Sequence, residues 1–291
     1  MSPPPPVKGV VGREPDVVGN PAMRFEQFGD ELAVASSAAE LLVDVVRQRR
    51  DARVIVPAGR TPVALFAAIV ERARTRELDL SRVRFFQLDE YVGVGPKDPR
   101  SFHAFLREHL LDPLRRAGDQ DFLLDGAAKD PRAEIERHAA RLAQAGGADL
   151  VFLGIGRNGH VGFNEPGTPA DQGARVVELA EQTRQHAAAA AGSNGSRGRS
   201  PTRGMTLGLQ EIRKARRVAL LATGAAKAGI VAALFDELPT TQRPASLLLD
   251  HPGFVVFADV AAAARLHGGA ARSSWSRRAR QNQGRGATVR G

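Results

Sequence analysis

Cysteine is absent from this chain of 291 residues, which excludes disulfide bonds and thiolate metal sites. Aromatic residues make up only 5% of it, so a core must come mainly from the aliphatic residues that bring the hydrophobic share to 43%. No apolar run approaches the ~18 residues that span a bilayer, and the proline-rich N-terminus lacks the apolar centre of a signal peptide. We therefore expect a cytoplasmic protein with no membrane partner.

Acidic residues are missing from two segments, and these segments account for the whole net charge of +9. Residues 192–203 hold three arginines and residues 267–291 hold six, so the remainder of the chain is formally neutral. Both segments are also rich in glycine and serine, a composition that buries too little apolar surface to fold. The simpler interpretation is solvated chain, and weak, salt-dependent attraction to RNA, DNA or anionic surfaces is the alternative. No specific nucleic-acid partner is expected.

The composition along the chain predicts three parts: a disordered proline-rich tail at 1–22, a single folded domain at 23–266 and a disordered basic tail at 267–291. Within the domain, short apolar runs alternate with helical patterns, such as a helix capped by Asp30 whose apolar stripe begins at Leu32. The runs are VIVP (54–57), VRFFQL (83–88), ADLVFL (148–153), VALLAT (218–223) and GFVVFAD (253–259). Strands that are buried on both faces read as continuous apolar runs. The alternation therefore predicts an α/β fold with a doubly wound, Rossmann-like, mostly parallel sheet and helices on both faces.

Unusual residues gather at the ends of four of these runs. The ends read PAGRTP (57–62), LDEYVG (88–93), GIGRNGH (154–160) and TGAAK (223–227). In open parallel sheets, ligands bind outside the carboxyl ends of the strands. We therefore expect the four loops to form one site.

Two of these loops suit an anion. PAGRTP places Arg60 and Thr61 at a turn into a helix, where free N–H groups and the helix dipole attract negative charge. The alternative is a plain helix cap, with Thr61 at the N-cap and Pro62 at the first helical position. Lys227 lies in a first helical turn, where a cation opposes the dipole. A bound phosphate explains this lysine, and a solvated lysine is the alternative.

The other two loops offer acid–base groups. Asp89, at a strand end, is a candidate general base or else a turn-forming aspartate. The imidazole of His160 can donate and accept protons near neutrality, and Glu165 is close enough in sequence to orient it; a surface histidine is the alternative. Anion loops, a carboxylate base and a histidine together suit proton transfer on a sugar phosphate.

A cofactor is not expected. The G-x-G-x-x-G spacing at 154–159 is not followed by a long helix or by an acidic strand end, so it does not predict NAD binding. The histidines and acids are not spaced as a metal-ligand set.

The segments LDEYVGV, GIGRNGHVGFNEPGT and LLATGAAKAGIVAAL resemble glucosamine-6-phosphate deaminases, also called glucosamine-6-phosphate isomerases, over about residues 23–266. The related 6-phosphogluconolactonases share the fold and the G-x-x-x-G-H turn, but they typically have arginine at the place of Tyr91 and lack the FNEP run (163–166). The resemblance implies conversion of glucosamine 6-phosphate and water into fructose 6-phosphate and ammonia. It also implies a homo-oligomeric enzyme of amino-sugar catabolism.

The resemblance assigns roles to single residues. Asp89 matches the base that moves a proton between C2 and C1, His160 matches the residue that assists ring opening, and Glu165 matches its carboxylate partner. Asn158 matches an orienting position where some members have aspartate and others have asparagine. The phosphate-binding positions are matched by Ala58, Gly59, Arg60, Thr61 and Lys227.

The chain departs from the family pattern in its phosphate contacts. Arg60 stands where a small residue is usual, and the arginine that grips the phosphate in many members falls near Ala189, in an alanine run. Loss of a charge-assisted hydrogen bond costs roughly 1.5–3 kcal/mol, which is about 10- to 100-fold in affinity. Arg60, Arg197 or Arg199 could compensate. Two alternatives stay open: a lactonase-like hydrolase of sugar phosphates, and a catalytically weak regulator that binds sugar phosphates.

Overall fold

The computed structural model describes residues 24–116, 120–181, 183–185 and 200–266. The two predicted tails, 1–22 and 267–291, lie outside these residues, so the domain boundaries stay predictions. Within the described ranges, no helix is both long enough and apolar enough to cross a bilayer.

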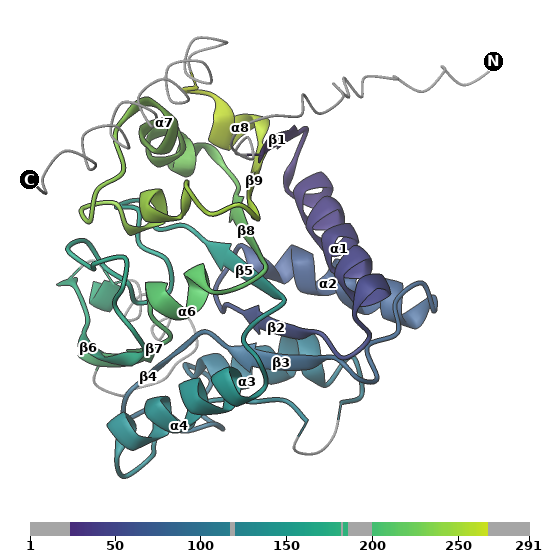
Figure 1. The fold of residues 1–291 in the computed structure, drawn as a ribbon, viewed down its shortest axis with the longest axis vertical. Coiled ribbons are helices and arrows are strands. Elements are labelled where there is room, and N and C mark those ends of the chain that lie inside the picture. The colour runs from purple at the N-terminus through teal and green to yellow at the C-terminus, as the bar shows by residue number, and fades with distance from the viewer. Residues whose placement is uncertain (1–23, 117–119, 182, 186–199, 267–291) are drawn as a thin grey trace, which may run out of the picture.

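A six-stranded sheet forms the centre of the molecule (Figure 1). Its strand order is β1-β9-β8-β5-β2-β3, and all five pairings between neighbours are parallel. The strands are β1 (Arg24–Phe28), β2 (Arg53–Val56), β3 (Arg84–Gln87), β5 (Leu150–Gly154), β8 (Arg217–Ala222) and β9 (Phe254–Asp259). All five apolar runs in the sequence therefore become strands, which confirms the predicted sheet. The edge strand β1 has no such run and was not predicted.

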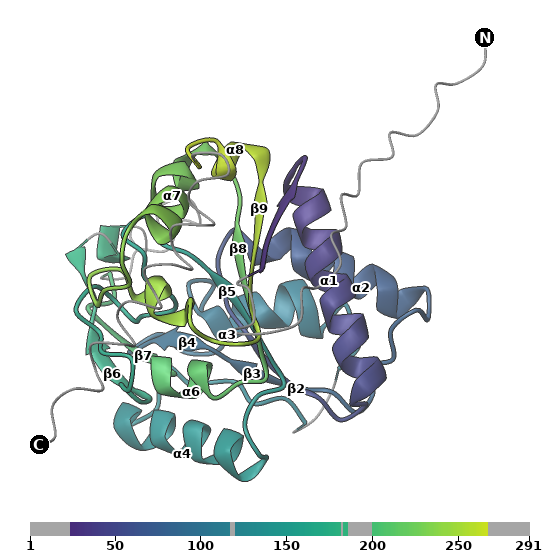
Figure 2. The same ribbon diagram turned by 45° about the horizontal axis from the view of Figure 1, so that its top comes forward.

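Helices cover both faces of this sheet, as Figure 2 shows. α1 and α2 pack on one face, and α4, α6 and α7 pack on the other. The helical elements are α1 (Glu31–Gln48), α2 (Pro62–Arg74), α3 (Phe102–Leu106), a π-helical turn η1 (Arg107–Leu111), α4 (Pro131–Gln144), α6 (Leu209–Arg213), 3-10 turns η2 (Ala225–Lys227) and η3 (Pro244–Leu248), α7 (Ala228–Asp236) and α8 (Val260–Ala263). The Asp30 carboxylate accepts a hydrogen bond from the Ala33 N–H (2.8 Å), so Asp30 caps α1 as predicted.

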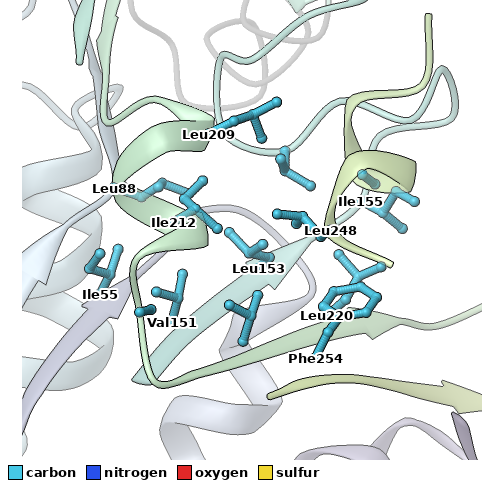
Figure 3. Packing of buried hydrophobic residues seen from close by; sticks show 14 of the residues in the cluster. Ile55, Leu88, Val151, Leu153, Ile155, Leu209, Ile212, Leu220, Leu248 and Phe254 are labelled. Atoms are coloured by element: carbon cyan, nitrogen blue, oxygen red, sulfur yellow. The ribbon is translucent and has the colours of Figure 1, made fainter. Parts of the chain in front are cut away.

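The core has two halves because strand side chains alternate between the faces. On β5, Val151 and Leu153 pack in the half that faces α4, α6 and α7, and Leu150 and Phe152 pack in the half that faces α1 and α2. Figure 3 shows the first half, where Leu153 lies between Ile212 and Leu220. Both faces of β5 are therefore covered by side chains, and the strand becomes accessible to solvent at its carboxyl end, at Gly154.

A second, three-stranded antiparallel sheet lies beside the large one and was not predicted. It consists of β4 (Asp89–Tyr91), β7 (Arg203–Thr206) and β6 (Arg175–Glu178), with β7 in the middle. Short strands of mixed polarity give no clear apolar run, and their pairing partners are far apart in the sequence. This sheet matters for the site because β4 begins with Asp89.

One expectation for α1 is wrong. Leu32 was assigned to the buried stripe, but it is 73% exposed, whereas Ala35, Ala39 and Leu42 are buried as expected. Leu32 lies in the first helical turn, and the buried residues of α1 begin two positions later, at Val34.

Candidate active site

The strand order places all four predicted loops side by side. β8, β5, β2 and β3 are consecutive neighbours in the sheet and run in the same direction. Their carboxyl ends therefore meet at one edge, where TGAAK, GIGRNGH, PAGRTP and LDEYVG begin. The sequence predicted this convergence without knowing the order of the strands.

Asp89 lies where the chain leaves the large sheet and enters the small one. Its side chain is almost fully buried, and no cation among the described residues pairs with it. Burial, and secondly the charge of Glu90, raise the pKa of Asp89 well above its usual value. A carboxyl group with a raised pKa can take up and return a proton closer to neutral pH than an ordinary aspartate can.

Glu90, next to this aspartate, is held in place by hydrogen bonds. Its buried carboxylate accepts from the Ser101 hydroxyl (2.8 Å) and from the backbone N–H groups of Phe102 (3.0 Å) and His103 (2.7 Å) at the start of α3. The Gln87 side-chain amide donates both to Glu90 (3.1 Å) and to the carbonyl oxygen of Asp89 (2.7 Å). Sequence reasoning did not assign this positioning role, because the donors follow Glu90 by more than ten residues and come together only through the fold.

β7 connects the Asp89 strand to the histidine loop. Thr206 of β7 is paired with Asp89 across the small sheet. Its hydroxyl also accepts a hydrogen bond from the Phe163 N–H (3.3 Å), three residues after His160. The two acid–base loops are therefore attached to the same strand.

The histidine loop forms a compact polar cluster. The Nδ1 atom of His160 lies 3.4 Å from Oε2 of Glu165, and the Asn158 amide donates to the same oxygen (3.1 Å). The Asn158 side-chain oxygen accepts from the backbone N–H of His160 (3.2 Å), and the Thr183 hydroxyl donates to the other oxygen of Glu165. Burial opposes ionisation of Glu165, but the contacts from His160, Thr183 and Asn158 outweigh it and lower its pKa. Thr183 was not predicted, since it lies 18 residues beyond Glu165.

Gly156 makes room for the histidine ring. A Cβ atom at this position would lie 2.4 Å from the His160 ring atoms Nδ1 and Cε1. The backbone N–H of Gly156 also donates to the carbonyl oxygen of His160 (2.9 Å), which closes the turn. Glycine at position 156 therefore leaves the space that the ring occupies.

The PAGRTP loop exposes the groups that could meet an anion. Gly59 has a φ of 116°, a conformation that favours glycine, and Arg60 is exposed beside it. Ala58 and Thr61 are half-buried. Thr61 precedes α2, but its hydroxyl makes no capping hydrogen bond, which argues against the plain-cap alternative. Its hydroxyl is thus available to a ligand at this edge.

Lys227 points back toward the histidine loop. Its ammonium group donates to the carbonyl oxygen of Ile155 (2.6 Å), and burial together with the positive charge of Arg157 lowers its pKa. The lysine is half-buried, which argues against a freely solvated side chain. The structure thus places the cation of the TGAAK loop in contact with the GIGRNGH loop.

Other residues of the motifs serve packing. Tyr91 is buried against Phe102 and Phe163, with ring centroids 4.6 and 5.3 Å away. Asn164 is fully buried and donates to the carbonyl oxygens of Val161 and Leu207, each at 3.0 Å. These contacts attach the FNEP run to the small sheet.

The expected phosphate arginine cannot be placed. The position near Ala189, and Arg197 and Arg199, lie outside the described residues. Within the described part of the chain, no group of three or more histidine, aspartate or glutamate side chains is arranged to hold a metal ion.

The sequence and the fold are similar to those of proteins of one known family. Residues 30–256 match the family model of glucosamine-6-phosphate isomerases/6-phosphogluconolactonase. The glucosamine-6-phosphate deaminase of Geobacillus sp. (strain WCH70) is 38% identical over 237 residues, which cover 81% of this chain and 93% of the relative. A solved monomeric glucosamine-6-phosphate deaminase superposes with a TM-score of 0.77 at 31% identity and covers 84% of this chain and 100% of that one. The 6-phosphogluconolactonase from Trypanosoma brucei has a TM-score of 0.66 at 22% identity, with coverage of 84% and 99%, which shows a shared fold.

Proposed function

This chain belongs to the family of glucosamine-6-phosphate isomerases and 6-phosphogluconolactonases, and from that membership we propose that it is a glucosamine-6-phosphate deaminase. It converts glucosamine 6-phosphate and water into fructose 6-phosphate and ammonia. Relatives that carry the deaminase name, at 33–38% identity over most of the chain, support this reaction. The observation in the structure that carries the proposal is the buried Asp89, which pairs with no cation of the described residues and lies at the same sheet edge as the His160–Glu165 pair.

In the proposed mechanism, His160 opens the pyranose ring. The reaction needs one group that can both give and take a proton at the ring oxygen and the C1 hydroxyl, and an imidazole does this near neutral pH. Glu165 keeps its negative charge and stabilises the imidazolium form, while Asn158 and Thr183 hold Glu165 in place.

Asp89 then moves the proton in the open chain. It takes the proton from C2 and returns it to C1, and the C1 oxygen gains a proton, so the C1 aldehyde becomes a hydroxymethyl group and C2 becomes an imine. Water hydrolyses this imine to the C2 ketone and releases ammonia. Burial is consistent with this role, because a poorly solvated carboxylate is a stronger base than one in water. Glu90, Gln87 and the start of α3 hold the aspartate in one position.

The phosphate of the substrate binds to the remaining two loops. We assign it to the backbone of Ala58 and Gly59, to the side chains of Arg60 and Thr61, and to Lys227. The burial that lowers the pKa of Lys227 fits this assignment, since a poorly solvated ammonium group is stabilised by a bound anion. We expect Arg60 to supply part of the charge that the family resemblance implies near Ala189.

The Asp89→Asn variant tests the proposal. We expect turnover of glucosamine 6-phosphate, measured as ammonia and fructose 6-phosphate, to fall by roughly 10³-fold or more with binding retained. The same protein is incubated with 6-phosphogluconolactone, whose hydrolysis without deamination would favour the lactonase alternative. Binding of glucosamine 6-phosphate without turnover by the natural chain would favour the regulator. Wild-type-like deamination by Asp89→Asn would remove Asp89 from its role.

The assembly state and the location are separate proposals. The resemblance suggests a homo-oligomer, whereas one solved deaminase of similar structure is described as monomeric, and the composition suggests the cytoplasm. Light scattering on the purified full-length chain distinguishes these two states.

A further inference from the structure

A second basic cavity lies at the opposite edge of the large sheet, where the strands begin. It has a volume of about 540 Å³. Its walls come from the end of α1, the residue before β5, the segment that leads into β8 and the loop before β9. The lining residues are Val45, Gln48, Arg49, Asp149, Ala215, Arg216, Arg217 and Pro252. None of these residues belongs to the four loops of the proposed active site.

Strand register brings the charges of this cavity together. Arg53 begins β2, Asp149 directly precedes β5, and Arg216 directly precedes β8, all at the same edge of the sheet. The Asp149 N–H donates to the Arg53 carbonyl oxygen (2.8 Å), and the Arg216 N–H donates to the Ala148 carbonyl oxygen (3.0 Å). These hydrogen bonds place the first residues of the three neighbouring strands side by side at the mouth of the cavity.

One buried carboxylate faces three guanidinium groups here. Arg53 binds both oxygens of Asp149, with Nε at 2.8 Å from one and Nη2 at 2.9 Å from the other, and both side chains are buried. This bidentate pair alone neutralises Asp149. Arg49 and Arg216 nevertheless also approach the same carboxylate, at 3.6 and 3.3 Å.

The remaining cations of the cavity are only partly compensated. Arg49 lies 3.3 Å from the exposed Asp51, and its buried Nε has no hydrogen-bond partner. Among the described residues, Arg217 donates a single side-chain hydrogen bond, a long one (3.4 Å) to the Gln48 side chain. The Arg216 side chain is 71% exposed. The lining itself holds three arginines, Arg49, Arg216 and Arg217, and one carboxylate, Asp149, so its formal charge is +2.

We propose that this cavity binds a phosphate dianion carried on a small organic molecule. The surplus of two positive charges matches a dianion, and the planar N–H donors of the guanidinium groups match phosphate oxygens in geometry. The side chains of Val45, Ala215 and Pro252 form an apolar part of the wall, which suits the organic part of a phosphomonoester. The site is distinct from the proposed active site, and it does not depend on the proposed reaction.

The test titrates phenyl phosphate into the full-length chain by calorimetry at about 0.15 M salt, where long-range attraction is screened. The Lys227→Ala background weakens phosphate binding at the other edge of the sheet, so one equivalent of ligand should report on this cavity. Adding Arg216→Gln and Arg217→Gln together should weaken that binding at least 10-fold, as expected for lost charge-assisted hydrogen bonds. The matched control, Arg82→Gln with Arg84→Gln, removes two exposed arginines near the same edge but outside the cavity.

Equal affinity in the Arg216/Arg217 double variant, with its melting temperature unchanged, would overturn the site. An equal loss of affinity in the control pair would also overturn it, because the binding would then follow net charge alone. Inorganic phosphate is titrated in parallel. Weaker binding of inorganic phosphate supports a monoester site, and equal binding overturns the part assigned to the apolar wall.

Discussion

Replacing Gly156 with alanine should displace the His160 ring and reduce catalysis without lowering the stability of the fold. The new Cβ atom would lie 2.4 Å from the histidine ring, whereas ordinary contacts begin at about 3.4 Å. The ring must therefore move by about 1 Å. The backbone of Gly156 has no positive φ, so alanine causes no backbone strain, and a side chain at the surface of the site can shift at little cost.

The expected cost appears in catalysis. A misplacement of about 1 Å in a reacting group can reduce the rate by about 100-fold, which is about 2.7 kcal/mol of transition-state stabilisation. We expect kcat/KM for glucosamine 6-phosphate to fall by this factor, while the melting temperature changes by no more than a few degrees. Gly29→Ala is the matched control, since a Cβ atom there meets nothing within 4 Å.

The assay follows ammonia release from the cyclic substrate and compares it with an open-chain analogue that needs no ring opening. The defect of Gly156→Ala should be much smaller with the analogue, because His160 acts before proton transfer by Asp89. Wild-type kcat/KM in this variant, or an equal loss on both substrates, would refute the link between Gly156, the ring position and ring opening.

Three further predictions concern charge. First, kcat/KM should fall as the pH is lowered through the raised pKa of Asp89, because the base must be ionised; a pH–rate profile with no acidic limb above the ordinary range of aspartate would contradict this. Second, Thr183→Val should reduce kcat by roughly 10-fold, because Glu165 loses a donor that stabilises its charge, and Thr183→Ser should restore most of the rate. Third, Asp149→Asn should destabilise the fold by roughly 3–5 kcal/mol in urea unfolding, because Arg53 is then buried without its counter-charge; a change below 1 kcal/mol would show that the pair is dispensable.

The apolar runs were sufficient to predict the large sheet. β2, β5 and β9 are buried on both faces almost throughout, and continuous burial produces an apolar run that can be recognised without knowing the partner strands. β4, β6 and β7 could not be predicted in this way. They are three or four residues long, only partly apolar, and pair across separations of more than 20 residues.

The sequence predicted those parts of the candidate site in which the contacting residues lie close together along the chain. Asn158, His160 and Glu165 lie within eight residues, and the turn at Gly156 folds them into one cluster. Contacts over longer separations carried no such signal. Thr183 reaches Glu165 from another segment, and Ser101 and the start of α3 fasten Glu90 from more than ten residues away.

The sequence by itself determined the type of sheet, the loops that bear chemistry and the residues offered by each loop. These features depend on local pattern: burial of a strand, the conformational freedom of glycine and the charge of a side chain. Only the tertiary structure decided which groups act on one another, because strand order sets which loops are neighbours and burial sets the charge state of what they carry. The raised pKa of Asp89 and the lowered pKa of Lys227 both come first from burial in the folded chain, and the arginine cavity at the far edge joins α1, β8 and the segments before β5 and β9, which are distant in the sequence.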